Sequence, residues 1–432
     1  MADDSRIRII VLLSALALLA ACGTDDAASE EQAQAGTSDE EVAGDPDDDA
    51  AEVAGNLTDE CAPADAEGDL FVDKVAFDEA TGVTVDYHDD HKLVEVTIPD
   101  TGEALTYALV QCGTDGPEDL DEGAQVIEVP VATVATMTTA NVPHLAALDV
   151  VDRLVGVANG GFITTPEVAE RVGDGEVPDL ADDSGTPDDE LLLGADPGVV
   201  FIDAFGPGVA DDVARLGDLG IPAVPNADFD ESSLLARAEW VKFTSLFFNT
   251  EAAAEAEYTE IASSYQAIAD LAADADATPR VLTEQPFEGT WYVPGGESLA
   301  AVGITDAGGE YVFDHISESG STGLDIETVL DTAADADVWL AAGSVTGALD
   351  DLVAQDERFS AIQAVDEENV WAIDVNLSPG GGYPIYEEAY ARADHYLADL
   401  VAILHPELMP DHELRYFGQV GSEVDPDGDA DA

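Results

Sequence analysis

Positive charge is scarce in this 432-residue sequence: lysine and arginine together number 13, against 94 aspartates and glutamates, for a formal net charge of -81 at pH 7. Such a surface repels phosphate groups, so nucleic acid and anionic membrane surfaces are poor partners for it. Because acidic residues occur in every segment, we interpret them as solvated faces of a protein adapted to a salty medium, where the Debye length falls to about 3 Å at 1 M salt. The chain is not disordered as a whole, because 46% of its residues are hydrophobic, enough for two or three domains.

Sequence motifs for catalysis are missing as well. The chain has no nucleophile elbow, no His-Glu-x-x-His metal motif and no triad-like grouping. Carboxylates are plentiful, so a secreted hydrolase that uses paired carboxylates remains an alternative, supported only by their abundance. We therefore expect that the protein is not an enzyme.

The N-terminus carries a targeting pattern. Arg6 and Arg8 precede an apolar run, Ile9–Ala21, that is too short to span a bilayer but suits the core of a signal peptide. The run ends in Leu-Ala-Ala followed by Cys22, which resembles the lipobox of bacterial-type lipoproteins. Residues 1–22 are therefore a predicted lipoprotein signal peptide, with Cys22 as the lipidation site; an ordinary cleaved signal with a chance cysteine is the alternative.

Large apolar and aromatic side chains are nearly missing from residues 23–66, which contain no lysine or arginine. Such a segment cannot bury enough surface to offset the entropy lost on ordering. We predict that residues 23–66 form an acidic disordered tether, and that residues 419–432 form an acidic tail.

Two cysteines remain after the lipidation site is assigned. In an extracytoplasmic setting Cys61 and Cys112 can form a disulfide, which would contribute on the order of 4 kcal/mol by closing a loop of about fifty residues. Two free thiols are equally compatible with the sequence, because spacing alone does not show geometry.

Short β segments separated by turn residues dominate residues 67–124. They predict a small antiparallel β meander, which precedes the α/β part of the chain. Within it, His88-Asp89-Asp90-His91 has the residue types of a metal cluster but lies where a hairpin should turn, and no further ligand spacing supports it. We expect a turn there and no metal site.

A helix followed by an apolar strand occurs twice, in residues 187–202 and 324–340. Each copy places a glutamate in the first helical turn, Glu190 and Glu327, where the helix dipole favours a negative charge. The duplication predicts two similar α/β lobes.

The lobes are expected at residues 125–230 and 279–418, where strands alternate with helices and so favour parallel βαβ units. Residues 231–278 contain neither glycine nor proline and predict connecting helices, with a break at Asn249-Thr250 and a long rigid helix over 251–273. The last lobe is expected to close with a helix over 386–404. The predicted fold class is α/β, with two Rossmann-like lobes joined by a long rigid helix and preceded by a small antiparallel β segment.

Residues 129–417 resemble the ABC-importer substrate-binding proteins that serve ferric siderophores, haem and cobalamin, the iron-siderophore/cobalamin family. The order and spacing of several segments carry the resemblance: residues 152–157, 190–202, 219–222, 290–296, 306–309, 327–340 and 404–414. The family fold holds its ligand in the cleft between two lobes joined by a helix that limits hinge motion. The resemblance implies a monomeric, lipid-anchored extracytoplasmic receptor at the cell membrane.

The resemblance also implies partners. In that family a glutamate on the outer surface of each lobe pairs with arginines of the permease, and the matching residues here are Glu190 and Glu327. Two carboxylates held at a fixed distance on one rigid body could bind two arginine pockets of a permease at the same time. The implied partners are the ABC permease and ATPase subunits and a small-molecule ligand; a permease-independent surface sensor or scaffold is an alternative.

Ligand contacts in an α/β lobe come from the loops at strand ends. On this basis the candidate ligand-binding residues are Trp291, Tyr292, Phe162, Asn159, Tyr383 and Arg392, with Thr138, Thr139 and Phe205 as further candidates. Aromatic rings among them would stack on a planar or macrocyclic ligand. Packing of the lobe surface is an equal explanation for Phe162, Phe205 and Tyr383.

The identity of the ligand stays open. No lysine or arginine lies between Arg280 and Arg358, and an anionic ferric siderophore usually requires arginines, which leaves Arg392 and Arg153 to supply them. A corrinoid or a neutral chelate is therefore as plausible as a siderophore. His315 could touch a metal centre, although a lone histidine is more often a surface residue. We expect no intrinsic cofactor.

Overall fold

The computed structural model describes residues 55–117, 119–120, 123–182, 186–317, 319–342 and 348–421. The predicted signal peptide with Cys22, most of the predicted tether and the end of the predicted tail lie outside the described residues. Within them, no helix is both long enough and apolar enough to cross a lipid bilayer.

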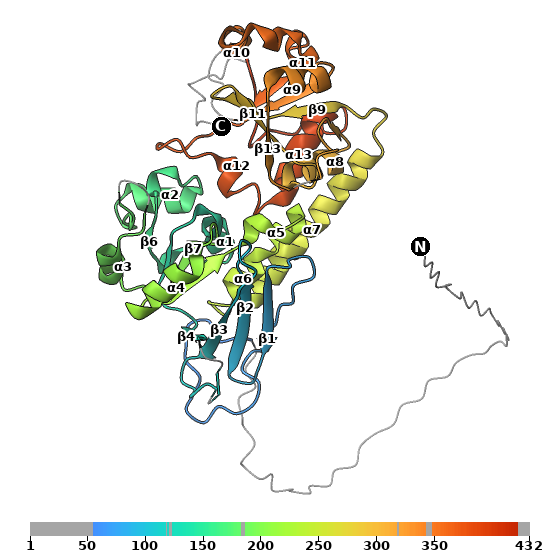
Figure 1. The fold of residues 1–432 in the computed structure, drawn as a ribbon. Coiled ribbons are helices and arrows are strands. Elements are labelled where there is room, and N and C mark those ends of the chain that lie inside the picture. Colours follow the sequence, from blue (N-terminus) through green and yellow to red (C-terminus); the bar gives the residue numbers. More distant parts are fainter. Residues whose placement is uncertain are drawn as a thin grey trace, which may run out of the picture. The chain divides into compact units, whose positions relative to one another are not determined.

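The first sheet has four strands (Figure 1), in the order β1-β2-β3-β4: β1 Val83–Tyr87, β2 His91–Thr97, β3 Ala104–Gln111 and β4 Gln125–Val129. Strands β1 to β3 are antiparallel, as predicted, whereas β4 is parallel to β3. The sequence places residues 125–129 in the N-terminal lobe, and the structure corrects this. Ile127 and Val129 are buried while Val126 is 56% exposed, so the strand extends this half-buried sheet.

The histidine pair at the first hairpin forms a turn. His88 donates its backbone N–H to the carbonyl of His91 at 2.9 Å, and the two rings stack with centroids 4.4 Å apart. Nδ1 of His91 lies 2.8 Å from a carboxylate oxygen of Asp90. Across the described ranges, no group of three or more His, Cys, Asp or Glu residues could hold a metal ion.

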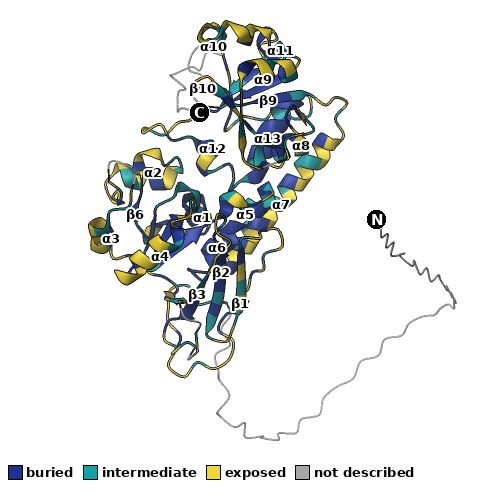
Figure 2. Cartoon of the chain, viewed as in Figure 1, coloured by how far each residue is buried: buried dark blue, intermediate teal, exposed yellow. Residues whose placement is uncertain are grey.

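The N-terminal lobe is built on a parallel sheet in the order β6-β5-β7-β8: β5 Val134–Thr136, β6 Leu154–Val157, β7 Val199–Asp203 and β8 Ala223–Asn226. Its helices are α1 Val142–Ala147, α2 Pro166–Gly173, α3 Asp189–Ala195 and α4 Val209–Asp218. Nearly every strand residue is buried, because a parallel sheet is covered on both faces (Figure 2). One hydrophobic core runs through this lobe and the first sheet.

Three helices connect the lobes: α5 Leu234–Ala238, α6 Trp240–Ser245 and α7 Glu251–Ala273. The break before α7 lies at Asn249, whose φ of 58° is left-handed and ends the preceding turn. Thr250 occupies the N-cap position, but its side chain accepts no capping hydrogen bond. Helix α7 spans the range expected for the connecting helix and packs against α6 and α13 (Figure 1).

The C-terminal lobe has a five-stranded sheet in the order β12-β9-β14-β15-β16: β9 Arg280–Thr283, β12 Glu310–Tyr311, β14 Val338–Ala341, β15 Val370–Ala372 and β16 Gly418–Gln419. All neighbours are parallel except β16. A smaller antiparallel sheet comprises β10 Pro286–Phe287, β11 Thr290–Pro294 and β13 Ser321–Leu324. The helices are α8 Leu299–Asp306, α9 Ile326–Ala333, α10 Leu349–Gln355, α11 Gln363–Asp366, α12 Pro384–Glu387 and α13 Ala393–Leu404.

The final helix differs from the prediction. The expected helix over 386–404 is divided into α12 and α13, which are separated by residues 388–392. The two duplicated units are present as α3 with β7 and α9 with β14. Each helix is N-capped by an aspartate: Asp188 accepts from the backbone N–H groups of the first turn of α3, and Asp325 does the same for α9.

Residues 55–66 are attached to the folded body, which corrects the predicted boundary of the tether. Cys61 and Cys112 form a disulfide, with Cα atoms 4.7 Å apart. Asn56 donates to a carboxylate oxygen of Glu251 at 2.8 Å. The polar side chains that the sequence assigns to solvent are here hydrogen-bonded to buried groups, and these bonds offset the ordering entropy.

A buried ion pair lies at the start of α7. The side chains of Lys92 and Glu251 are both 0% exposed, and Nζ lies 2.6 Å from Oε1. The ammonium also donates to the carbonyl of Leu246 and to Oδ1 of Asn249, which satisfies its three protons. Burial lowers the pKa of Lys92, and the neighbouring Glu251 opposes that shift. The pair joins β2 of the first sheet to the connecting helix.

Replacing Lys92 with methionine is expected to lower the free energy of unfolding by about 3–5 kcal/mol, because Glu251 would remain buried without its cation. The double variant Lys92→Met, Glu251→Leu should lose less. Lys74→Met is the matched control, since Lys74 and Asp69 form an exposed pair whose loss should cost about 0–1 kcal/mol. Urea denaturation at constant salt measures all three. Equal losses for Lys92→Met and Lys74→Met would contradict the prediction.

Candidate functional site

The loops that follow the parallel strands of the two lobes touch one another at residues 161–165 and 378–387. We call this region of contact, together with the neighbouring strand-end loops, the seam. The loop after β15 reaches the loop after β6: Oγ of Ser378 donates to the carbonyl of Gly161 at 2.6 Å, and the backbone N–H of Gly380 donates to the same oxygen at 3.0 Å. A Cβ atom on Gly382 would overlap the carbonyl of Phe162, so only glycine permits this approach. The carboxyl ends of parallel strands are where α/β folds place ligand contacts.

A carboxylate from the C-terminal lobe binds the start of a helix in the N-terminal lobe. Glu387, in α12 and 3% exposed, accepts the backbone N–H groups of Thr164 and Thr165 at 2.9 and 2.8 Å. It also accepts the hydroxyl of Thr165 at 2.5 Å. These N–H groups precede α2, whose dipole favours an anion there. Burial raises the pKa of Glu387, and the hydrogen bonds from Thr165 and Thr164 oppose that shift.

Arg237 lies where α5 meets the seam. Its Nε donates to Oδ2 of Asp228 at 3.0 Å, and its guanidinium lies 3.8 Å from the ring centroid of Tyr390. Asp228 follows β8 in the N-terminal lobe, whereas Tyr390 lies between α12 and α13 in the C-terminal lobe. The arginine therefore joins both lobes through one charge-assisted hydrogen bond and one cation–π contact.

Glu284 is the first residue after β9. Its φ of 64° lies in the left-handed region, which is costly for a residue with a Cβ atom and is often found at functional sites. Its backbone is held on both sides: its N–H donates to the carbonyl of Leu340, and its carbonyl accepts Nε1 of Trp339 at 2.6 Å. Burial raises the pKa of the Glu284 carboxyl to about 7.

Large exposed aromatic side chains occur in both lobes: two follow strands β6 and β7 of the N-terminal lobe, and two lie in β10 and α12 of the C-terminal lobe. In the N-terminal lobe Phe162 is 49% exposed and Phe205 is 79% exposed. In the C-terminal lobe Phe287 and Tyr386 are 69% and 52% exposed. Aromatic rings left in water at the ends of strands are available to cover an apolar or planar ligand.

The structure corrects the prediction for Trp291. This side chain is 0% exposed, its Nε1 donates to the carbonyl of Thr283 at 3.0 Å, and its ring packs against Trp339 and Phe359. Strand β11 alternates inward and outward, so Trp291 points into the core while Tyr292, its neighbour, is 48% exposed.

Arg392 is also placed away from the seam. It is bound by Asp394 at 2.9 Å and lies 3.8 Å from Glu257 of α7, on the side of the lobe where α13 packs against the connecting helix. Arg153 is likewise occupied, by the carbonyls of Val131 and Thr58 and by Asp59. Neither arginine can provide the positive charge at the seam that the sequence assigns to it.

The remaining predicted residues lie in loops between strands and helices. Asn159 is exposed and left-handed, with φ of 54°, directly after β6. Tyr383 is partly buried and its ring meets that of Tyr386 at 5.7 Å. Thr138 caps the turn after β5 that contains Thr139. His315 is a surface residue whose side chain is 66% exposed.

Arg237, Glu284, Glu387, Phe287 and Tyr386 were not predicted from the sequence. Glu284 follows strand β9 directly and Phe287 lies three residues on, so a search of the residues after each strand could have identified them. Arg237 lies in the connecting segment and Glu387 within a predicted helix, and no pattern in the sequence marks either.

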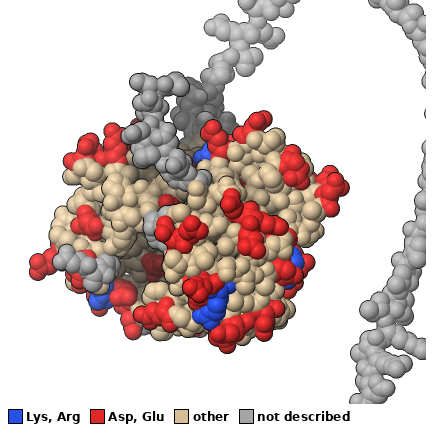
Figure 3. Space-filling view, turned by 90° about the horizontal axis from the view of Figure 1, so that it is seen from above, with Lys and Arg blue, Asp and Glu red and all other residues tan. Residues whose placement is uncertain are grey.

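The two glutamates in the duplicated helices lie on the outside of their lobes. Glu190 is exposed in the first turn of α3. Glu327, in the first turn of α9, has a side chain that is 71% exposed and lies 2.7 Å from Nη1 of Arg358. The face shown in Figure 3 carries many carboxylates and few cations, so these two differ from other acidic residues by their position in the repeat and not by exposure.

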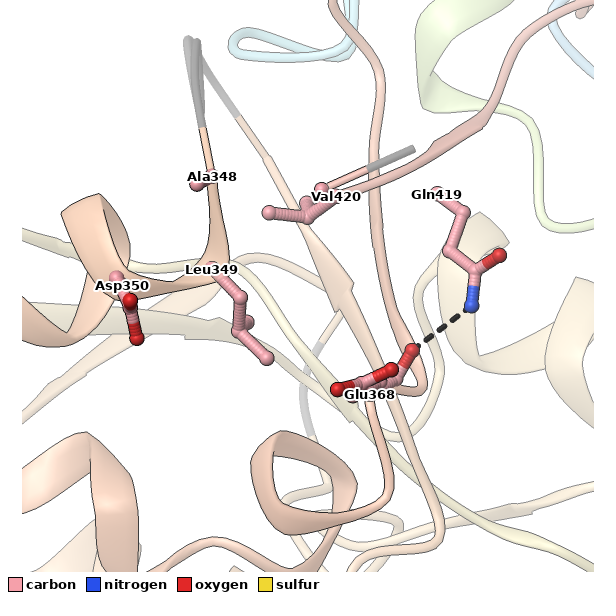
Figure 4. A pocket seen from close by; sticks show the side chains of 7 residues that line it. Ala348, Leu349, Asp350, Glu368, Gln419 and Val420 are labelled. Atoms are coloured by element: carbon pink, nitrogen blue, oxygen red, sulfur yellow. Dashed lines mark hydrogen bonds between the residues drawn. The ribbon is translucent and has the colours of Figure 1, made fainter. Parts of the chain in front are cut away.

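A hollow of about 450 Å³ lies elsewhere, at the outer edge of the C-terminal sheet (Figure 4). It is lined by Ala348, Leu349, Asp350, Glu368, Gln419, Val420 and Gly421. It is open to solvent, and its described lining contains no aromatic ring and comes from one lobe alone. The seam has the stronger chemistry for ligand binding.

Several proteins are similar to this chain. An uncharacterized lipoprotein of Methanocaldococcus jannaschii, MJ0878, is 24% identical over 360 residues, which cover 79% of this chain and 82% of that protein. A second uncharacterized lipoprotein of the same organism, MJ0872, is 24% identical over 331 residues, covering 73% of this chain and 80% of that protein.

Solved structures share the fold. A periplasmic binding protein of Veillonella parvula matches with a TM-score of 0.53 at 14% identity, covering 75% of this chain and 98% of that one. Helicobacter pylori CeuE, in a nickel–histidine complex, matches with a TM-score of 0.52 at 16% identity, covering 74% and 90%. These likenesses establish the two-lobed α/β fold. A family profile described as periplasmic binding protein matches residues 134–377, more than half of the sequence, and the chain therefore belongs to the periplasmic binding protein family.

Proposed function

We propose that this protein is a lipid-anchored extracytoplasmic receptor that binds an iron chelate or a corrinoid at the seam and delivers it to an ABC permease. The observation that carries the proposal is the presence of exposed aromatic rings in both lobes: Phe162 and Phe205 in the loops after β6 and β7, Phe287 in β10 and Tyr386 in α12. In a member of a family of binding proteins, such rings favour a ligand with a large planar or apolar surface.

The relatives support the location and the kind of cargo. Two relatives in Methanocaldococcus jannaschii are lipoproteins, which agrees with Cys22 as the lipidation site. CeuE was crystallised with nickel and histidine, and a structure with a TM-score of 0.50 and 16% identity, covering 68% of this chain and 99% of that one, is a periplasmic heme-binding protein of Pseudomonas aeruginosa. A metal-containing ligand is the class that these proteins share.

Limited motion of the lobes is part of the proposal. The contacts of Glu387 with Thr164 and Thr165, and of Gly161 with Ser378 and Gly380, join the two lobes at the seam. Each is a hydrogen bond that must be broken to separate the loops at this point, at a cost of about 1 kcal/mol or more. Ligand exchange would therefore use the part of the seam away from these contacts.

Removing an exposed ring at the seam should weaken ligand binding. We expect Phe287→Ala and Tyr386→Ala each to lower affinity by about tenfold, equivalent to about 1.4 kcal/mol, because each ring loses its contact with the ligand. The control is Leu271→Ala, which removes a side chain 38% exposed near the end of α7. Calorimetric titration at high salt with ferrioxamine, haemin and cyanocobalamin measures the effect. No binding of any of the three would contradict the proposed ligand class.

Charge reversal at the two outer glutamates should abolish delivery while sparing ligand binding. Because a permease with arginine pockets would repel new cations, we expect the double variant Glu190→Arg, Glu327→Arg to lose most ligand-dependent stimulation of the reconstituted ATPase. The matched control is Glu95→Arg, Asp270→Arg, which reverses two exposed charges on β2 and α7. Full stimulation by the first double variant would refute the docking role.

The acidic surface should make folding depend on salt. On dialysis from about 1 M to about 0.1 M salt the Debye length rises from roughly 3 to 10 Å, so repulsion among the carboxylates extends much farther. We expect the circular dichroism spectrum to lose helical and strand signal, and salt added back to restore it. An unchanged spectrum would count against adaptation to a salty medium.

A further inference from the structure

Two charged residues at the seam, Glu284 and Arg237, differ in their partners. Among the residues that the structure describes, no hydrogen-bond donor or basic side chain contacts the carboxylate of Glu284. The charged or titratable groups whose fields reach it are tyrosines: Tyr311 of β12, Tyr386 of α12, Tyr390 after it and Tyr396 of α13. A partly buried carboxylate without a cation is expensive, so such groups are retained where a ligand completes them.

The backbone at this point supports a role in binding. Glu284 adopts the left-handed conformation, which is strained for a glutamate, although an asparagine or a glycine would adopt it at lower cost. The hydrogen bonds from its backbone to Leu340 and Trp339 hold it there. Three residues on, Phe287 of β10 is 69% exposed, so a charge and a ring lie close together along the chain.

Positive charge is not free at the seam. Arg237 is bound by Asp228 at 3.0 Å and covered by the ring of Tyr390. Arg153 and Arg392 are bound by acidic residues away from the seam. An anionic ligand entering between the described loops would meet Glu284 with no unpaired guanidinium to compensate, and like charges at a partly buried site disfavour binding.

We propose that Glu284 determines the charge class of the ligand: the site selects metal chelates or corrinoids that carry a cationic or hydrogen-bond-donating group beside an apolar surface, and rejects anionic ones. This inference rests on the proposed function, since it assumes that the ligand binds at the seam. The donor group would contact the Glu284 carboxylate, and the apolar surface would lie against Phe287 and Tyr386. A charge-assisted hydrogen bond of this kind is about twice as strong as a neutral one.

A matched ligand series tests the inference. Ferrioxamine B carries a terminal ammonium, its N-acetyl derivative is neutral there and its N-succinyl derivative is anionic, while the ferric trihydroxamate is the same in all three. Cyanocobalamin, its monocarboxylate and its aminoethylamide form a second series on a corrinoid. At pH 8 and high salt, we expect calorimetric titration of the full chain to give the order cationic, neutral, anionic, with at least a tenfold difference in Kd between the extremes.

The variant Glu284→Gln keeps the shape of the side chain and removes its charge. We expect it to bind the neutral ligand within about threefold of the unmodified protein and to lose most of the preference between cationic and anionic ligands. Glu288→Gln is the control, because Glu288 is an exposed glutamate on the other side of the short strand β10 with a similar φ of 51°. It should retain the full preference.

Acidification supplies an independent readout. Since burial raises the pKa of Glu284 to about 7, lowering the pH from 8 to 5.5 should neutralise it and reduce the preference in the unmodified protein but not in Glu284→Gln. The four facing tyrosines stay protonated throughout, because their pKa values are raised above 10.

The outcomes separate the inference from the proposed function. Binding without a charge preference, or a preference that persists in Glu284→Gln, would overturn the role of Glu284 and leave the receptor function in place. Failure of all six ligands to bind would overturn the proposed ligand class, and the inference with it.

Discussion

Helix α7 belongs to both hydrophobic cores, and the arrangement of the lobes depends on this. Ala254 and Tyr258 pack in the core of the N-terminal lobe, whereas Ile261 and Tyr265 pack in the core of the C-terminal lobe. A helix of 23 residues is about 35 Å long, and it contains neither glycine nor proline at which a sharp kink would form. Its first residue, Glu251, is bound to Lys92 of the first sheet, so the helix is also fixed at its start.

The seam contains contacts that hold the two lobes together and a carboxylate that no hydrogen-bond donor or basic side chain of the described residues contacts. Glu387, Ser378 and Gly380 hold the loops of the two lobes together at one point, while Glu284 is left without a partner among the described residues. Attachment limits how far the loops separate. The Glu284 carboxylate, which has no partner among the described residues, is the group that we propose a ligand contacts. In the function we propose, stability and binding use different carboxylates of the same region. In a chain with 94 acidic residues, this distinction depends on where each carboxylate is placed.

Much of the architecture could be predicted because it depends on local patterns. The absence of glycine and proline over residues 226–278 indicated the connecting helices, and the repeated glutamate-then-strand units indicated two lobes. The site was predicted less well. Trp291 and Tyr292 are adjacent in sequence, but the alternation of β11 buries one and exposes the other, and the sequence does not show which face of the strand is covered. Arg392 forms ion pairs with Asp394, two positions away, and with Glu257 of α7, so its guanidinium group is not available to a ligand at the seam.

The sequence by itself determined the class of fold, the duplicated units and the length of the helix between them, because hydrophobic periodicity and helix-breaking residues act over a few positions. The tertiary structure alone decided which side chains meet. Arg237 and Tyr390, or Glu387 and Thr165, are separated by more than a hundred residues, and their contact depends on how two lobes pack on one helix. The attachment of residues 55–66 to the first sheet decided that Cys61 and Cys112 are bonded, since a disulfide requires two Cα atoms within a few ångströms and spacing along the chain does not specify that distance.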